Sequence, residues 1–147
     1  MRWVVRHAGA LLGVYLVLLA IALFSPSSEQ QSGAVVWLEG LLRLVGAPQE
    51  LTSFDRLEVL MNAVIVAPAT FLASLVLPQY GWRDWTCFGF VAAVTVEGAQ
   101  GLLLPGRQAS FSDVVANTAG ALAGAVLLHG VRYMAGSRSM LRASRSD

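Results

Sequence analysis

Hydrophobic residues in this chain come in four long blocks separated by short polar segments. The blocks occupy residues 8–24, 57–77, 85–104 and 112–134. At about 1.5 Å of rise per residue, each of the last three is long enough to cross a hydrocarbon core of roughly 30 Å. Only helices or closed barrels satisfy their backbone hydrogen bonds within lipid. The pattern therefore predicts four membrane-spanning helices.

The first block has the basic start and apolar middle of a signal peptide. Its apolar run is long, however, and FSPSS follows it where an A-x-A cleavage site would stand. We expect an uncleaved span.

A fifth helix is expected between the first two spans, over residues 33–49. Glu39 and Arg43 are four apart, so they share one helical face. The segment is too short to cross a membrane, and Trp37 is of the type that anchors helices at an interface. The sequence leaves open whether this helix lies flat on lipid or covers the bundle.

Composition agrees with a membrane protein. Hydrophobic residues make up 56% of the 147, and charged residues only 13%, against about a quarter in soluble domains. The predicted fold is an all-α integral membrane bundle, with one domain over residues 1–134 and a basic tail over 135–147. A water-soluble catalytic domain is excluded. Cys87 is the only cysteine, which excludes an intramolecular disulfide and a multi-cysteine metal site.

No cofactor, metal or nucleic-acid partner is expected. The glycine-containing stretch PGRQASFSD lacks the G-K-[ST] ending of a phosphate-binding loop. The expected partner is membrane lipid, and oligomers are possible.

Arginine placement predicts the orientation. Arginines precede the first span and follow the last, and cytoplasmic segments of membrane proteins carry an excess of basic residues. Both termini are therefore expected in the cytoplasm. The segment over residues 25–56 and the loop over 105–111 are then expected outside.

Polar residues inside the last two spans are the candidate site. Glu97 lies in the third span, where a charge costs at least about 2.5–3.5 kcal/mol. Gln100 follows one turn later on the same face. Asp113 and Asn117 share a face one turn into the fourth span, and Ser112 is the expected helix cap.

The second span adds Glu58 and Asn62, again four apart. With Arg107 in the outer loop, these side chains form one predicted polar cluster: Glu58, Asn62, Glu97, Gln100, Arg107, Asp113 and Asn117. The guanidinium and the amides are expected to hold the carboxylates, of which Glu97 and Asp113 are the candidate catalytic residues. A purely structural network that fixes helix register is the competing interpretation. Gly120 and Gly124 extend the stripe as packing positions, expected to face the third span.

At these residues the sequence resembles the VanZ family, named for a teicoplanin-resistance protein. The family pattern is similar to E-x-x-Q, Arg, Asp-Val and N-x-x-G, here at 97–100, 107, 113–114 and 117–120. Asn62 and Pro68 match a second-helix pattern, from which Val66 and Thr70 depart. The resemblance covers residues 56–126. It implies a small multi-pass protein of the bacterial cytoplasmic membrane and cell envelope, linked in some members to antibiotic resistance.

Three functions remain open from the sequence. The first is a membrane protein that binds or modulates a polar lipid, a lipid-linked cell-wall precursor or a glycopeptide at the outer leaflet. The second is an intramembrane hydrolase or transferase on a lipid-linked substrate, with Glu97 and Asp113 as an acid–base pair. The third is an oligomeric transporter or channel. Whether the protein is an enzyme is left undecided.

Overall fold

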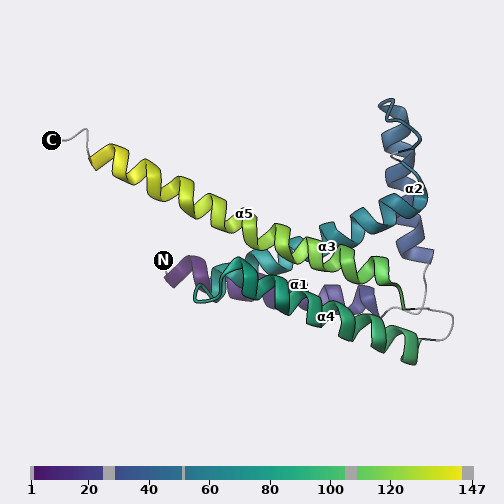
Figure 1. Cartoon of the computed structure of the whole chain (residues 1–147), viewed down its shortest axis with the longest axis horizontal. Coiled ribbons are helices and arrows are strands. Elements are labelled where there is room, and N and C mark those ends of the chain that lie inside the picture. Colours follow the sequence, from purple (N-terminus) through teal and green to yellow (C-terminus); the bar gives the residue numbers. More distant parts are fainter. Residues whose placement is uncertain (1, 25–28, 51, 105–108, 144–147) are drawn as a thin grey trace.

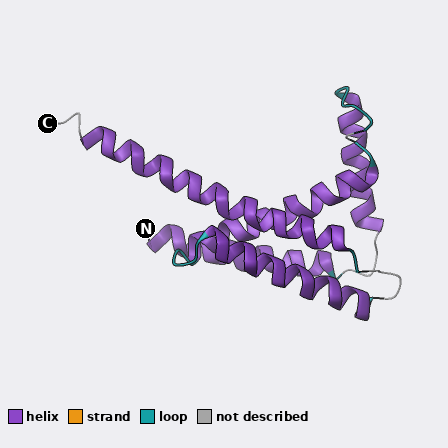
Figure 2. Cartoon of the chain, in the orientation of Figure 1, coloured by secondary structure: helices purple, strands orange, loops and turns teal. Residues whose placement is uncertain are grey.

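The computed structural model describes residues 2–24, 29–50, 52–104 and 109–143. Five helices make up this part of the chain: α1 (Arg2–Leu23), α2 (Glu29–Leu44), α3 (Phe54–Val76), α4 (Trp82–Leu103) and α5 (Phe111–Ala143) (Figure 1). No strand occurs among the described residues (Figure 2). The all-α prediction is confirmed.

Four of the helices are long and apolar enough to cross a membrane. The candidate spans are Arg6–Leu23, Phe54–Val76, Trp82–Leu103 and Phe111–Met134, and their bounds lie close to those of the four predicted blocks. The basic segment that follows the last span does not form a separate element, because α5 continues through it to Ala143. No proline interrupts residues 111–143, so the helical hydrogen bonding can extend beyond the apolar block.

The spans alternate in direction. In Figure 1, α1 and α4 run one way along the bundle, and α3 and α5 run the other way. The C-terminal ends of α1 and α4 therefore meet the N-terminal ends of α3 and α5 at one end of the bundle. We call this end the polar end, because Glu97, Gln100 and Asp113 lie towards it. The chain enters and leaves at the opposite end.

The helices do not pack equally. α5 has its most extensive contacts with α3 and then with α4, whereas α1 packs on α3. The glycines of α5 explain the close α3–α5 approach. A Cβ added at Gly120 would overlap the carbonyl oxygen of Ala63, and one at Gly124 would overlap that of Ala67. Small residues allow such backbone contact between membrane helices.

This packing differs from the expected one in two ways. The glycines of α5 face the second span, α3, and not the third; it is Ala121, between them, that faces α4. They are also covered within the chain, so they do not offer the interface between copies that an oligomeric transporter would use.

Helix α2 stands across the direction of the spans and projects sideways from the polar end (Figure 1). It packs on α3, and Val35 is buried while Trp37 and Leu44 are 68% and 84% exposed. Glu39 and Arg43 form an ion pair of 2.5 Å along one face. An apolar surface on a helix that lies across the spans favours the interfacial interpretation over a cover on the bundle.

Candidate functional site

Helix α4 supplies the two most deeply buried members of the predicted cluster. Glu97 is 7% exposed and Gln100 is 4% exposed. A carboxylate oxygen of Glu97, Oε2, accepts a hydrogen bond of 2.9 Å from the backbone N–H of Ser110. The side-chain amide of Gln100 donates a bond of 2.7 Å to the carbonyl oxygen of Leu23. The α4 residues thus hold the start of α5 and the end of α1.

Ser110 connects both carboxylate-bearing helices. It directly precedes the first residue of α5, and its Oγ accepts a hydrogen bond of 3.4 Å from the backbone N–H of Asp113. Its hydroxyl also lies 2.6 Å from that of Ser112. The N-cap prediction for Ser112 is therefore wrong by two residues: the helix begins at Phe111, and the residue before the first helical one is the cap.

A third polar contact joins α3 to α5. The amide of Asn62 donates a hydrogen bond of 2.8 Å to Oδ1 of Asp113. A neutral donor on a carboxylate is a charge-assisted bond, stronger than a bond between neutral groups. Glu58 lies one turn earlier on α3, with its side chain exposed. Asp113 is thus the point where α3 and α5 are tied together at the polar end.

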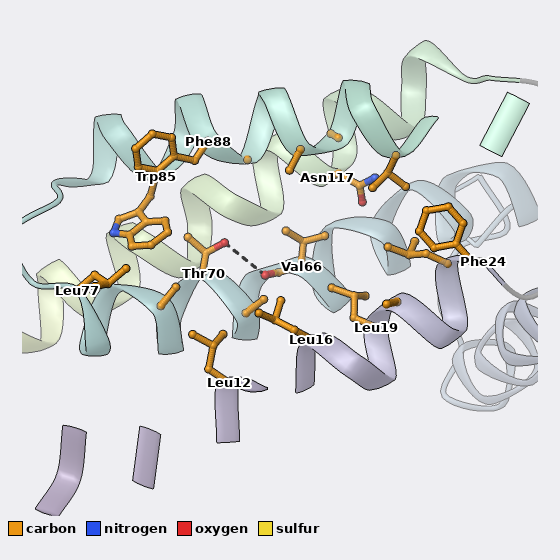
Figure 3. Close-up of a pocket in the computed structure, with 18 residues that line it drawn as sticks. Leu12, Leu16, Leu19, Phe24, Val66, Thr70, Leu77, Trp85, Phe88 and Asn117 are labelled. Carbon is orange, nitrogen blue, oxygen red and sulfur yellow. Dashed lines mark hydrogen bonds between the residues drawn. The ribbon is translucent and has the colours of Figure 1, made fainter. Parts of the chain in front are cut away.

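Asn117 does not join these carboxylates. Its side chain is 8% exposed, and its Oδ1 has no hydrogen-bond partner within the described part of the chain. The residue instead contributes to the wall of a cavity between α1, α3 and α4. Of the three amides expected to hold carboxylates, Asn62 does so, Gln100 binds the end of α1, and Asn117 points into this cavity (Figure 3).

The cavity, which we call the α1/α4 groove, has a volume of about 510 Å³ and an almost entirely apolar lining. On α1 it is bordered by a stripe of leucines at helical spacing, from Leu12 to Leu23. Space is left because many lining positions carry small side chains: Ala20, Ala69, Ala73, Ala92 and Ala93. Since α1 packs mainly on α3 and meets α4 through the Gln100–Leu23 hydrogen bond at the polar end, the groove opens between α1 and α4.

The two ends of the groove differ. Trp85 and Leu77 lie at the end away from the polar cluster, and Asn117 and Phe24 lie at the other (Figure 3). Trp85 packs edge-on against Tyr80 and Phe88, with ring centroids 5.9 and 5.7 Å apart. The hydrogen bond between Gln100 and Leu23 joins α4 to α1 at the polar end. The groove is therefore closed at its two ends and accessible from the side.

Arg107 falls in residues 105–108, outside the described residues. Its expected contact with the carboxylates stays a prediction. Among the residues that are described, no three His, Cys, Asp or Glu side chains are grouped so that they could hold a metal ion. The chemistry that the site offers is that of carboxylates and amides next to an apolar groove.

A bundle of four apolar spans, with acids and amides meeting at one end, defines a multi-pass α-helical membrane protein. Residues 11–132 match the family model described as VanZ/LLP1. The chain belongs to this family, and the match includes α1 and α2, which the sequence motifs alone did not reach. Comparison with curated proteins and with solved structures gave no significant match.

Several residues of the site escape sequence reasoning. Ser110 acts largely through its backbone N–H, which every residue except proline possesses. Leu23 acts through its carbonyl oxygen. Tyr15 donates to the carbonyl of Ile65 at 2.6 Å and ties α1 to α3. The adjacent small residues Ala92 and Ala93 of α4 are the available sequence signal for the groove.

Proposed function

We propose that this protein binds or modulates a polar lipid headgroup, or the polar part of a lipid-linked cell-wall precursor, at the polar end of its bundle. One observation carries the proposal: buried or half-buried polar side chains from α3, α4 and α5 converge at that end, with Glu97 and Asp113 among them. Intramembrane carboxylates are costly to keep and are typical of functional sites.

The donor and acceptor inventory favours a ligand rich in hydroxyl, amide or amine groups. A carboxylate has about four lone-pair positions, and the Asn62 amide occupies one of those on Asp113. Asn62 uses one of its two amide hydrogens on Asp113. Sugar hydroxyls and peptide N–H groups would donate to such acceptors. From the sequence, Arg107 is expected to add a cation for a phosphate or carboxylate of the ligand.

The proposed setting is the bacterial cytoplasmic membrane with the polar end outward. The support is the arginine distribution. Arginines gather near both ends of the chain, and the start of α1 and the end of α5 lie at the end of the bundle opposite the polar end (Figure 1). A Cys87→Ser background with Ser53→Cys, just before α3, provides the test. Labelling of the introduced thiol by an impermeant reagent in intact cells is the expected result. Labelling only after lysis would place the polar end inside.

Binding is tested with full-length protein in nanodiscs and a radiolabelled lipid-linked disaccharide peptide. Glu97→Gln keeps an acceptor for the Ser110 N–H but removes the charge, and Asp113→Asn keeps an acceptor for Asn62. Each is expected to weaken binding at least about tenfold, the loss of a charge-assisted bond of ~1.5–3 kcal/mol. Glu39→Gln, on α2 away from the cluster, is the matched control. Unchanged binding in both cluster variants would refute the proposal.

The same preparation separates the other two functions. Conversion of the labelled precursor, lost in Glu97→Gln, would identify a hydrolase or transferase in place of a binding protein. Flux of a polar solute into liposomes would identify a transporter.

The proposed link to resistance predicts that expression of the protein raises the teicoplanin concentration needed to inhibit growth. Arg107→Ala at equal expression should remove this effect, while Arg43→Ala should not.

A further inference from the structure

The α1/α4 groove is a pre-formed apolar cavity to which the polar cluster assigns no role. Its lining brings one face each of α1, α3 and α4 around about 510 Å³, within the range of ~300–1,000 Å³ typical of ligand pockets. Protein interiors are normally filled to the density of organic crystals. Five alanines line this space where leucines would close it.

The dimensions of the groove select its occupant. From Leu12 to Leu23 the α1 wall rises ~17 Å, close to the ~15 Å depth of one leaflet of a bilayer core. A single hydrocarbon chain matches this length and the almost entirely apolar lining of the groove.

Asn117 adds a polar requirement. Its Oδ1 is buried and unpartnered within the described residues, and the side chain points into the groove (Figure 3). A buried acceptor without a donor destabilises the fold. A water molecule would need two to four polar partners, yet the hydroxyl of Thr70 in the groove lining is directed to the carbonyl of Val66, 3.5 Å away. A donor carried by the occupant is the remaining solution.

We infer that the α1/α4 groove binds one hydrocarbon chain of a membrane amphiphile, and that Asn117 accepts a hydrogen bond from a hydroxyl or amide N–H at the base of that chain. The chain lies along the leucine stripe of α1, with its far end against Trp85. This inference deepens the proposed function. The identity of the headgroup bound at the polar end rests on that proposed function. The chain site itself is tested with probes whose headgroup is held constant.

The test uses Trp85 as a reporter. Full-length protein with Trp3, Trp37 and Trp82 changed to Phe keeps one tryptophan, in the groove wall. The probe is a lysophospholipid brominated on its acyl chain, which quenches tryptophan on contact and carries a hydroxyl at the base of its chain. Saturable quenching at a low lipid-to-protein ratio is expected, because a defined site fills before the surrounding lipid is replaced.

Two variants two residues apart on α1 separate the groove from the lipid surface. Ala20→Phe fills the groove and is expected to weaken the saturable quenching at least about tenfold. Ala22→Phe, which does not line the groove, is expected to leave it unchanged. Circular dichroism and monodispersity confirm folding of both. Quenching that never saturates, or that is equal in the two variants, would overturn the chain site.

Asn117→Leu tests the hydrogen bond. Loss of one neutral bond of ~0.5–1.5 kcal/mol corresponds to roughly 2- to 10-fold weaker binding of the hydroxyl-bearing lysolipid. A probe with that hydroxyl methylated should bind wild type and Asn117→Leu alike. Equal binding of the hydroxyl probe to both proteins would overturn the role of Asn117. Since the two probes share one headgroup and differ only at the hydroxyl, this comparison does not depend on whether a headgroup binds at the polar end.

Discussion

Two asparagines inside the spans offer a direct test of which polar groups hold the bundle together. Asn62 donates a 2.8 Å hydrogen bond to Asp113 across α3 and α5. Asn117, on α5, has a buried Oδ1 with no partner in the described part of the chain. Leucine has nearly the shape of asparagine, so Asn62→Leu and Asn117→Leu remove polar atoms with little change in volume.

The two substitutions are expected to change the free energy of unfolding differently. Asn62→Leu removes a bond to a carboxylate and leaves Asp113 without that donor. Interhelical hydrogen bonds in membranes contribute ~0.6 kcal/mol on average and up to about 2, and losing the partner of a charged group adds to this. We expect a destabilisation of about 1–3 kcal/mol. Asn117→Leu removes an acceptor that is already unsatisfied, and such a change is close to neutral or stabilising.

Equilibrium unfolding by SDS in mixed micelles, followed by circular dichroism, measures both variants against wild type. The reasoning predicts a lower midpoint for Asn62→Leu and an unchanged or higher midpoint for Asn117→Leu. The double variant should show the sum of the two effects, because no hydrogen bond joins the two side chains. If Asn117→Leu destabilised the protein as much as Asn62→Leu does, Asn117 would be a structural residue and its assignment to the groove would be refuted.

Further predictions concern helix contacts at single positions. Gly124→Ala should destabilise the bundle by about 1–3 kcal/mol, because its Cβ would overlap α3 backbone; Gly130→Ala, with open space around it, should be neutral or slightly stabilising in the same SDS titration. Glu97→Leu should destabilise more than Glu97→Gln, since only glutamine retains an acceptor for the α5 cap; equal midpoints would contradict the bond. Gln100→Leu should loosen the end of α1, which would appear as faster proteolysis after Leu23. The SDS unfolding midpoint, to which the α3–α5 contacts contribute, should stay unchanged.

The fold was largely predictable from the sequence. Long apolar blocks can be satisfied in a membrane by helices, and their lengths match the bilayer. Glu39 and Arg43 were expected on one face of a helix and form an ion pair there. Local spacing decides such features. The N-cap at Ser110 was missed by two residues because either serine can cap a helix, and only the backbone conformation distinguishes them.

The site was predictable as a set of residues but not as a set of contacts. Spacing placed Glu97 with Gln100, and Asp113 with Asn117, on shared helical faces. The structure then separates each pair by partner: Glu97 binds Ser110, Gln100 binds Leu23, and Asp113 binds Asn62. The direction of Gly120 and Gly124 towards α3 likewise depends on how α5 is rotated in the bundle. A helical pattern reports which residues share a face, not which neighbour that face meets.

The sequence by itself determined that this chain is a four-span membrane protein with acids and amides within its spans, because hydrophobic length and helical periodicity are properties of contiguous segments. Tertiary structure alone decided that α1 packs on α3 and leaves a groove beside α4, and that Asn117 faces this groove while Asn62 meets a carboxylate. Those features arise from the relative rotation and spacing of separate helices. Such relations depend on side-chain volumes in all four spans at once, and no single segment contains them.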